Sequence, residues 1–185
     1  MPYSEWRPGI IPPSPVYLDA CTLTASFIAR DPRYKNTTRL FADLLGSRAE
    51  LLISMLTLSE SLWGIAKLSF QQIERQKART HFAPHIFRKH ADNIFRVYGA
   101  RMHAIHSWLR DWRQSGINVS LMPNDVDSLQ QVSQVAPTYM QKFRLASSDA
   151  YHLATAEMGA KSLLTTDTEF ERADASPLEI YLIAA

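Results

Sequence analysis

Short apolar runs alternate along the chain with longer segments in which apolar residues recur every three or four positions. Runs of this kind predict strands at residues 16–18, 51–54, 117–121, 161–165 and 178–183. The three-or-four spacing predicts helices over 22–30, 37–45, from 57 onward, 86–114, 125–136, 148–159 and 167–172. Because strands and helices alternate, we expect a parallel α/β sheet with helices on both faces.

Several predicted helices carry residues typical of helix ends. Gly46 is a natural C-cap for the helix over 37–45, and Gly116 stops the longest helix. Thr57 and Glu60 have the spacing of a capping box, in which each side chain bonds the backbone of the other. Ser148 and Asp149 place cap residues at the front of the helix over 148–159.

The composition is that of one globular domain spanning residues 1–185. With 46% hydrophobic and 21% charged residues, the chain has enough apolar material for a core, which excludes a disordered protein. Cys21 is the only cysteine, which excludes a disulfide scaffold and suits a reducing compartment. No apolar run reaches the ~20 residues that cross a bilayer, and the proline-rich N-terminal extension, residues 1–15, lacks the apolar stretch of a signal peptide. We therefore expect a cytoplasmic protein with no membrane partner.

Charge is distributed unevenly along the chain. Residues 75–113 contain nine basic and two acidic residues together with five of the six histidines. Since the whole chain carries only +2, this segment is near +7 and the remainder near −5. Such asymmetry indicates a polyanionic partner. We expect a basic helical insertion at about 70–116 that contacts RNA through Arg75, Lys77, Arg79, Arg88 and Lys89.

Two other interpretations of this insertion stay open. Its charges could form only the solvated face of a helix, and we assign its aromatic residues to the core because they share the spacing of a buried stripe. A groove between these helices could equally receive a segment of a protein partner.

Four acidic residues share a placement at the ends of predicted strands or the starts of helices. Asp19 and Asp167 follow strands directly, whereas Glu60 and Asp149 lie early in helices. The carboxyl ends of parallel strands meet at one edge of a sheet, so these acids are expected to cluster there. Clustered carboxylates repel unless a positive charge neutralises them, and no Lys or Arg lies within two residues of Asp19, Asp149 or Asp167. The missing charge is most simply a divalent cation, and oxygen ligands favour Mg²⁺, with Mn²⁺ as a substitute.

Each acid taken alone also has a structural interpretation. Glu60 could only complete the capping box, Asp149 could only cap a helix, and Asp167 could only begin a turn. Asp19 is harder to explain in this way, because a carboxylate beside a buried apolar strand needs a partner. The prediction of a metal site therefore rests on the four acids taken together.

For the side chains beside these acids we also compare a functional role with a purely structural one. Thr165 either orients a water or metal-bound group or is an ordinary β-branched strand residue, and Glu169 either reaches the site or faces solvent. We expect His152 to be a packed, hydrogen-bonded histidine rather than a ligand, although it shares a helix face with Asp149. Cys21 is expected to be a small buried hydrophobe and not a nucleophile.

The motifs around these acids resemble those of PIN-domain nucleases. Residues 16–21 (Val-Tyr-Leu-Asp-Ala-Cys) resemble the first motif of that family, and Glu60 within 58–62 matches the second. Residues 148–156 (Ser-Asp-Ala-Tyr-His-Leu-Ala-Thr-Ala) resemble the third almost residue for residue, and 159–170 the fourth. The resemblance covers about 16–68 and 117–183 and leaves 70–116 unexplained.

This resemblance implies a three-layer α/β/α fold with a short, mainly parallel central sheet, extended here by the helical insertion. It also implies a Mg²⁺-dependent ribonuclease, commonly a VapC-type toxin that forms a homodimer and is held inactive by a small antitoxin. Hydrolysis of a phosphodiester bond needs an activated water and stabilised phosphoryl charge, both of which Mg²⁺ supplies. We assign Asp19 and Asp149 as direct ligands, and Glu60 and Asp167 as ligands bound directly or through water.

Two other functions compete with this assignment. The chain could be a non-catalytic PIN-like module that binds RNA or protein, although the presence of all four acids favours the enzyme. A phosphatase with Asp19 as nucleophile fits less well, because Cys21 stands where such a site has its second acid.

Overall fold

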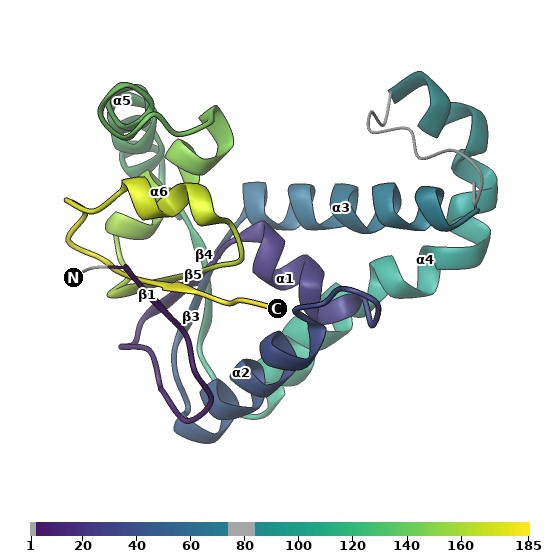
Figure 1. Cartoon of the computed structure of the whole chain (residues 1–185), viewed down its shortest axis with the longest axis horizontal. Coiled ribbons are helices and arrows are strands. Elements are labelled where there is room, and N and C mark those ends of the chain that lie inside the picture. The colour runs from purple at the N-terminus through teal and green to yellow at the C-terminus, as the bar shows by residue number, and fades with distance from the viewer. Residues whose placement is uncertain (1–2, 74–83) are drawn as a thin grey trace.

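The computed structural model describes residues 3–73 and 84–185, and its centre is a sheet of six parallel strands (Figure 1). In chain order the strands are β1 (Tyr3–Glu5), β2 (Val16–Leu18), β3 (Leu51–Ser54), β4 (Val119–Met122), β5 (Ser162–Thr165) and β6 (Glu179–Leu182). Their order across the sheet is β1-β6-β5-β2-β3-β4, and every neighbouring pair is parallel. The prediction of a parallel sheet is confirmed, and β2 lies at its centre between β5 and β3.

Helices cover both faces of the sheet, which confirms the three-layer architecture (Figure 1). They are α1 (Ala20–Phe27), α2 (Tyr34–Ser47), α3 (Met55–Ile73), α4 (Pro84–Gln114), α5 (Val126–Phe143) and α6 (Ser147–Glu157), with a 3₁₀ helix, η1 (Thr168–Arg172), before β6. Side chains of α5 and α6 form one apolar core with the sheet. Side chains of α2 and the end of α4 form a second core with the opposite face.

Strand β2 shows how the alternation of side chains divides these two cores. Val16 and Leu18 pack in the core beneath α2, while Tyr17 between them packs against α5 and α6. All three are fully buried, as expected for a strand in the middle of a parallel sheet. The side chain of Tyr17 is thereby directed to the face on which α6 lies.

The long helix predicted over 86–114 is confirmed as α4, which with α3 extends away from the sheet (Figure 1). The parts of α3 and α4 nearest the sheet pack on α1 through a third apolar cluster of Leu23, Ile65, Ala66 and Ile105. This cluster fixes the start of α3, where Glu60 lies, against the helix that follows Asp19.

Two predicted helix caps are wrong. Gly46 lies inside α2, which ends at Ser47 with Arg48 as its C-cap in the left-handed region at φ 54°. Helix α6 begins at Ser147 after Ala146 and has no side-chain cap, so Asp149 sits within its first turn.

The capping box assigned to Thr57 and Glu60 also lies one turn earlier than predicted. The amide of Thr57 donates to Ser54 Oγ at 2.9 Å, and the amide of Ser54 donates to Thr57 Oγ1 at 3.3 Å. The box is therefore Ser54 with Thr57. Glu60 takes no part in it, and its carboxylate is available elsewhere.

The proline-rich N-terminal segment contributes to the sheet. Strand β1 pairs with β6 at the edge, and the amide of Trp6 donates to the Leu182 carbonyl at 2.8 Å. The Trp6 side chain is 3% exposed, and its indole N–H donates to the Ile10 carbonyl at 2.8 Å. No apolar run predicted this strand, because its sequence is Tyr-Ser-Glu, with a single apolar residue.

Candidate metal centre

Asp19 stands at the centre of the site, directly after β2. It is the N-cap of α1, and its Oδ1 accepts from the amide of Ala20 at 2.6 Å. Its Oδ2 accepts from Thr165 Oγ1 at 2.8 Å and from the Cys21 thiol at 2.7 Å. The side chain is almost fully buried, so these donors hold a carboxylate at the carboxyl edge of the sheet.

Thr165 joins Asp19 to Asp167. While its hydroxyl donates to Asp19, its oxygen accepts the amide hydrogen of Asp167 at 3.0 Å. The Asp167 carboxylate caps η1 by accepting from the amide of Glu169 at 2.8 Å. Thr165 is therefore more than a β-branched strand residue, since it orders two of the predicted acids.

Glu60 reaches the same site from α3 and meets His152 from α6. Its Oε2 lies 3.0 Å from His152 Nε2, and Asp19 Oδ1 lies 3.4 Å from the same nitrogen. Burial opposes a charged imidazole, but Asp19 and the hydrogen bond with Glu60 outweigh it, so the pKa of His152 is above its usual value. The prediction of a packed, hydrogen-bonded histidine at position 152 is confirmed.

Tyr17 is a functional neighbour that the sequence analysis missed. Its hydroxyl lies 2.8 Å from His152 Nδ1 and donates to Ser54 Oγ at 2.8 Å. A signal was present, because a tyrosine inside an otherwise aliphatic buried strand needs a partner for its hydroxyl group. The sequence could not say which partner, since His152 is 135 residues away.

Asp149 lies in the first turn of α6 and shares the electrostatic field of this site. Partial burial and the charges of Asp19 and Asp167 raise its pKa to about 7, with His152 acting in the opposite direction. Burial and neighbouring carboxylates thus both disfavour the charged form of Asp149, as is common for acidic groups in functional sites.

These residues form a possible binding site for a divalent cation. Asp19, Glu60 and His152 each offer a ligand atom within 4.8 Å of the other two. Asp149 and Asp167 add charge to the same region. The donor set consists mainly of carboxylate oxygens, which fits the hard cations predicted from the sequence. The assignment of Asp19, Glu60, Asp149 and Asp167 as ligands stays a prediction.

Cys21 differs from its prediction as a simple hydrophobe. Besides donating to Asp19, its sulfur accepts from the amide of Thr166 at 3.2 Å and lies 3.4 Å from Thr165 Oγ1. Burial and the charge of Asp19 raise the pKa of the thiol, so it is not poised as a nucleophile. Cys21 instead helps to hold the loop that follows β5.

Glu169 and Arg33 lie at the margin of the site. Glu169 is partly exposed and lies 3.6 Å from Arg172, in agreement with the solvent-facing alternative. Arg33 is held by Asp31 and donates to Thr166 Oγ1 at 2.9 Å, beside Asp167. Its contact fixes the loop after β5 from a second side.

Of the residues predicted to contact RNA, Arg88 is exposed on α4. Lys89 belongs to the same helix, but its side chain is outside the described part. Arg75, Lys77 and Arg79 lie outside the described residues altogether. Their role in RNA contact stays a prediction.

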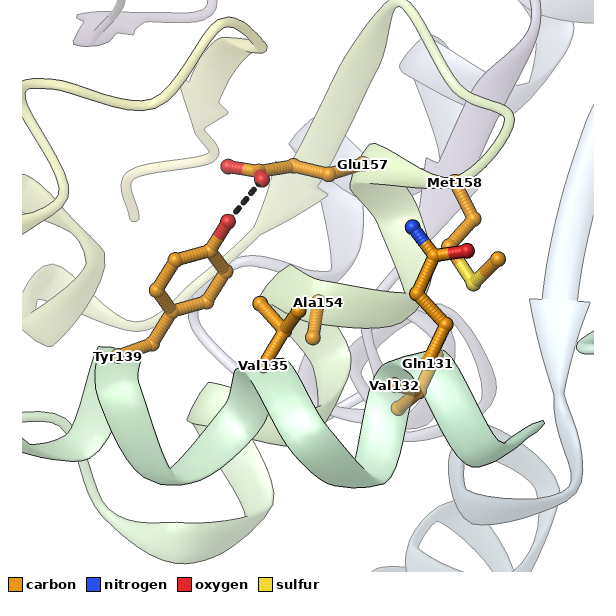
Figure 2. Close-up of a pocket in the computed structure, with 7 residues that line it drawn as sticks. All are labelled: Gln131, Val132, Val135, Tyr139, Ala154, Glu157 and Met158. Atoms are coloured by element: carbon orange, nitrogen blue, oxygen red, sulfur yellow. Dashed lines mark hydrogen bonds between the residues drawn. The ribbon is translucent and has the colours of Figure 1, made fainter. Parts of the chain in front are cut away.

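A cavity of about 120 Å³ lies apart from the acids, between α5 and α6 (Figure 2). Apolar side chains and Gln131 line it, and at one end the Tyr139 hydroxyl donates to Glu157 (Figure 2). The other oxygen of Glu157 accepts from Ser176 at 2.6 Å, so both carboxylate oxygens have partners. This arrangement links α5 and α6 to the loop before β6.

Within residues 3–73 and 84–185, no helix is long and apolar enough to cross a membrane.

Comparisons with known proteins bear on the family. A comparison with characterised proteins found no match. Among solved structures, the chain is similar to one from the structure described as FitAB bound to an IR36 DNA fragment, with a TM-score of 0.50 and 14% identity. That similarity covers 90% of this chain and 94% of the other, and at this identity it shows the fold alone. The sequence profile of the PIN domain matches residues 16–176, which include all four acids. The chain therefore belongs to the PIN domain family.

Proposed function

We propose that this protein is a divalent-metal-dependent endoribonuclease and the toxin of a toxin–antitoxin pair. The observation that carries the proposal is the convergence of Asp19 and Glu60 with His152 from three separate elements at one edge of the sheet, in the electrostatic range of Asp149. Membership of the PIN domain family supports the same chemistry, since nuclease activity is general in that family. The proposal specifies RNA as the substrate and Mg²⁺, or Mn²⁺ in its place, as the cofactor.

The chain's own residues supply an ordered set of ligands. The Asp19 carboxylate is fixed by three donors, so it needs little reorganisation when a cation binds. The Asp167 carboxylate is held by the amide of Glu169, and its backbone by the Thr165 hydroxyl group. Asp149 and Glu60 are more exposed and face the same region. When bound, the cation supplies an activated water and stabilises charge on the phosphoryl and leaving oxygens.

The experiment is an RNA cleavage assay with purified protein in Mg²⁺ or Mn²⁺ and in EDTA. We expect cleavage with metal, none with EDTA, and a loss of at least 100-fold in Asp19→Asn and Asp149→Asn. Asp174→Asn is the matched control, because Asp174 is an exposed acid outside the site. If wild type cleaves no RNA, the chain is a non-catalytic RNA-binding or protein-interaction module. If both site variants cleave as well as the control, the acids assigned here do not carry the cleavage.

For the basic insertion we propose contact with the phosphates of RNA. Arg88 is exposed on α4, and the predicted contacts Arg75, Lys77, Arg79 and Lys89 lie close to it in sequence. Replacing Arg75, Lys77 and Arg79 by Glu should weaken RNA binding and reduce its dependence on salt, because each lost phosphate contact removes counterion release. Metal binding should be unchanged, and an unchanged salt slope would assign these charges to solvation.

For the partner we propose a small antitoxin that inserts an apolar segment between α1, α2 and α4. A groove of about 270 Å³ lies there, lined mainly by aromatic side chains that include Phe27, Phe41, Trp108 and Trp112. Leu45 at its edge is 41% exposed, so Leu45→Glu should disrupt binding without disturbing the core. Co-expression with a short gene immediately upstream, followed by co-purification of wild type and variant, tests this partner. Size-exclusion chromatography with light scattering tests the homodimer that we also propose.

A further inference from the structure

His152 has both ring nitrogens in contact with polar groups, although its side chain is fully buried. Nδ1 lies 2.8 Å from the Tyr17 hydroxyl, while Nε2 faces Glu60 at 3.0 Å and Asp19 at 3.4 Å. A buried imidazole with both nitrogens engaged has a definite pattern of donors and acceptors, and its neighbours reveal that pattern.

The hydroxyl groups beyond Tyr17 fix the direction of each hydrogen bond. Thr57 Oγ1 donates to the Leu18 carbonyl at 3.1 Å, which uses its one hydrogen. Ser54 Oγ, 3.0 Å from Thr57 Oγ1, therefore donates to it, and Tyr17 donates to Ser54. The Tyr17 oxygen, held in place by these hydroxyl groups, lies 2.8 Å from Nδ1 and fixes that side of the ring.

The opposite nitrogen faces only acceptors among these contacts. Carboxylate oxygens of Glu60 and Asp19 cannot donate when ionised, so Nε2 donates. The Nε2–H is therefore directed at two carboxylates, while Nδ1 is held by the Tyr17 hydroxyl. Although its position is compatible with metal ligation, an Nε2 that carries hydrogen has no lone pair for a metal.

We propose that His152 is a positioning residue of the metal centre, which holds Glu60 beside Asp19 through its Nε2–H. Glu60 is on α3, and its flexible side chain is 35% exposed, so it needs a fixed partner to keep one conformation. The Tyr17–Ser54–Thr57 chain in turn prevents the ring from rotating. The proposal rests on the function proposed above and assigns His152 no contact with RNA or metal.

Two neutral substitutions separate positioning from charge. In His152→Gln the side-chain amide nitrogen can take the place of Nε2 and donate to Glu60, whereas in His152→Asn it is shorter and reaches only towards Tyr17. Both variants are neutral at position 152, so they differ only in the reach of the side-chain amide. We expect kcat for RNA cleavage to fall at least tenfold in His152→Asn and to be largely restored in His152→Gln, with KM for RNA unchanged in both.

A double-mutant cycle tests whether His152 acts through Glu60. In a Glu60→Gln background, adding His152→Asn should cause no further loss of kcat. Full additivity of the two effects, or equal activity of the Gln and Asn variants, would overturn the proposal. If His152→Asn does not fold, Tyr17→Phe replaces it in the cycle, since it frees the ring while keeping the imidazole.

Binding of Mn²⁺, measured by electron paramagnetic resonance, keeps this test independent of RNA cleavage. Because the Gln and Asn variants have equal charge, a difference in their affinity for Mn²⁺ reports the position of Glu60. We expect His152→Asn to bind Mn²⁺ about tenfold more weakly than His152→Gln. If wild type binds Mn²⁺ but cleaves no RNA, and the two variants still differ in Mn²⁺ affinity, the proposed function is contradicted and the positioning role is not. Equal Mn²⁺ affinities of the two variants would contradict the positioning role.

Discussion

The hydroxyl group of Thr165 donates to Asp19 across 2.8 Å and accepts the amide hydrogen of Asp167 at 3.0 Å. One side chain at the end of β5 thus connects two acids that lie far apart in the sequence but on adjacent strands. Both contacts are buried or partly buried, where an unsatisfied polar group is unfavourable. The position of Asp19 consequently depends on the hydroxyl group of Thr165.

Replacement of Thr165 by Val keeps the shape of the side chain and removes its hydroxyl group. We expect the free energy of unfolding to fall by about 1–3 kcal/mol, since the amide of Asp167 loses its acceptor and Asp19 loses a donor. RNA cleavage should fall at least tenfold because Asp19 is less well ordered. Urea denaturation and a cleavage assay measure the two effects. Thr165→Ser retains the hydroxyl group and should keep most activity, whereas full activity of Thr165→Val would contradict this role.

The layers and the site acids could be predicted because their signals are local. Apolar runs such as Leu51–Ser54 and the position of Asp19 directly after a strand are each visible within a few residues. In a parallel sheet, the position after a strand already places a residue at the carboxyl edge. Asp19 and Asp167 were therefore assigned to one region without knowledge of any contact between them.

The parts that the sequence could not predict depend on contacts between distant elements. Tyr17 and His152 gave separate hints of buried polar groups, but their pairing follows from the packing of α6 on β2. At the start of α3, Ser54 and Thr57 are both suitable N-cap residues, and the helix begins after the earlier of the two. At the site, that earlier start releases Glu60 from the backbone.

Ser54→Ala tests this helix start. Ser54 Oγ accepts from the amide of Thr57 at the first turn of α3 and from the Tyr17 hydroxyl. Loss of both contacts should lower the free energy of unfolding by about 1–3 kcal/mol, which urea denaturation measures. Ser59→Ala, at an exposed position on the same helix, is the control and should change stability by less than about 0.5 kcal/mol. Equal effects of the two substitutions on the free energy of unfolding would show that Ser54 does not cap α3.

Trp6→Ala tests the contribution of the N-terminal segment to the fold. Trp6 is buried beside β6, and its indole N–H has a partner in the Ile10 carbonyl. We expect a loss of about 3–5 kcal/mol, which is typical of a large aromatic side chain removed from a core. Arg7→Ala is the control, because Arg7 is exposed. A melting temperature of Trp6→Ala close to that of wild type would show that the segment packs only loosely.

Metal should stabilise the folded chain through the candidate site. Because a cation that binds only the folded state shifts the folding equilibrium, Mn²⁺ at ten times its dissociation constant adds about 1.4 kcal/mol. Thermal unfolding should therefore move to higher temperature with Mn²⁺ and return with EDTA. The same addition should have little effect on Asp19→Asn, which lacks the central carboxylate. A shift in that variant as large as in wild type would place the metal elsewhere.

The raised pKa of Asp149 predicts how stability changes with pH when metal is absent. Its pKa is about 7 in the folded chain and near 3.8 when unfolded, so between pH 4 and 7 the folded state binds more protons. The free energy of unfolding should therefore fall as pH rises through this range and level off above pH 7. Asp149→Asn carries no such charge, so its stability relative to wild type should increase from pH 4 to pH 8. Allowing for partial exposure of the side chain, we expect an increase of about 1–2 kcal/mol.

Urea denaturation in EDTA at several pH values measures this difference, with Asp174→Asn as an exposed control that should show little change. A bound Mn²⁺ ion would offset the repulsion that Asp19 and Asp167 exert on a charged Asp149. Added at pH 8, it should therefore stabilise wild type more than Asp149→Asn. The direction of the effect is informative, because an Asp149 that only capped its helix would be stabilising when charged. Asp149→Asn would then lose stability relative to wild type as pH rises, opposite to what the crowding of acids predicts.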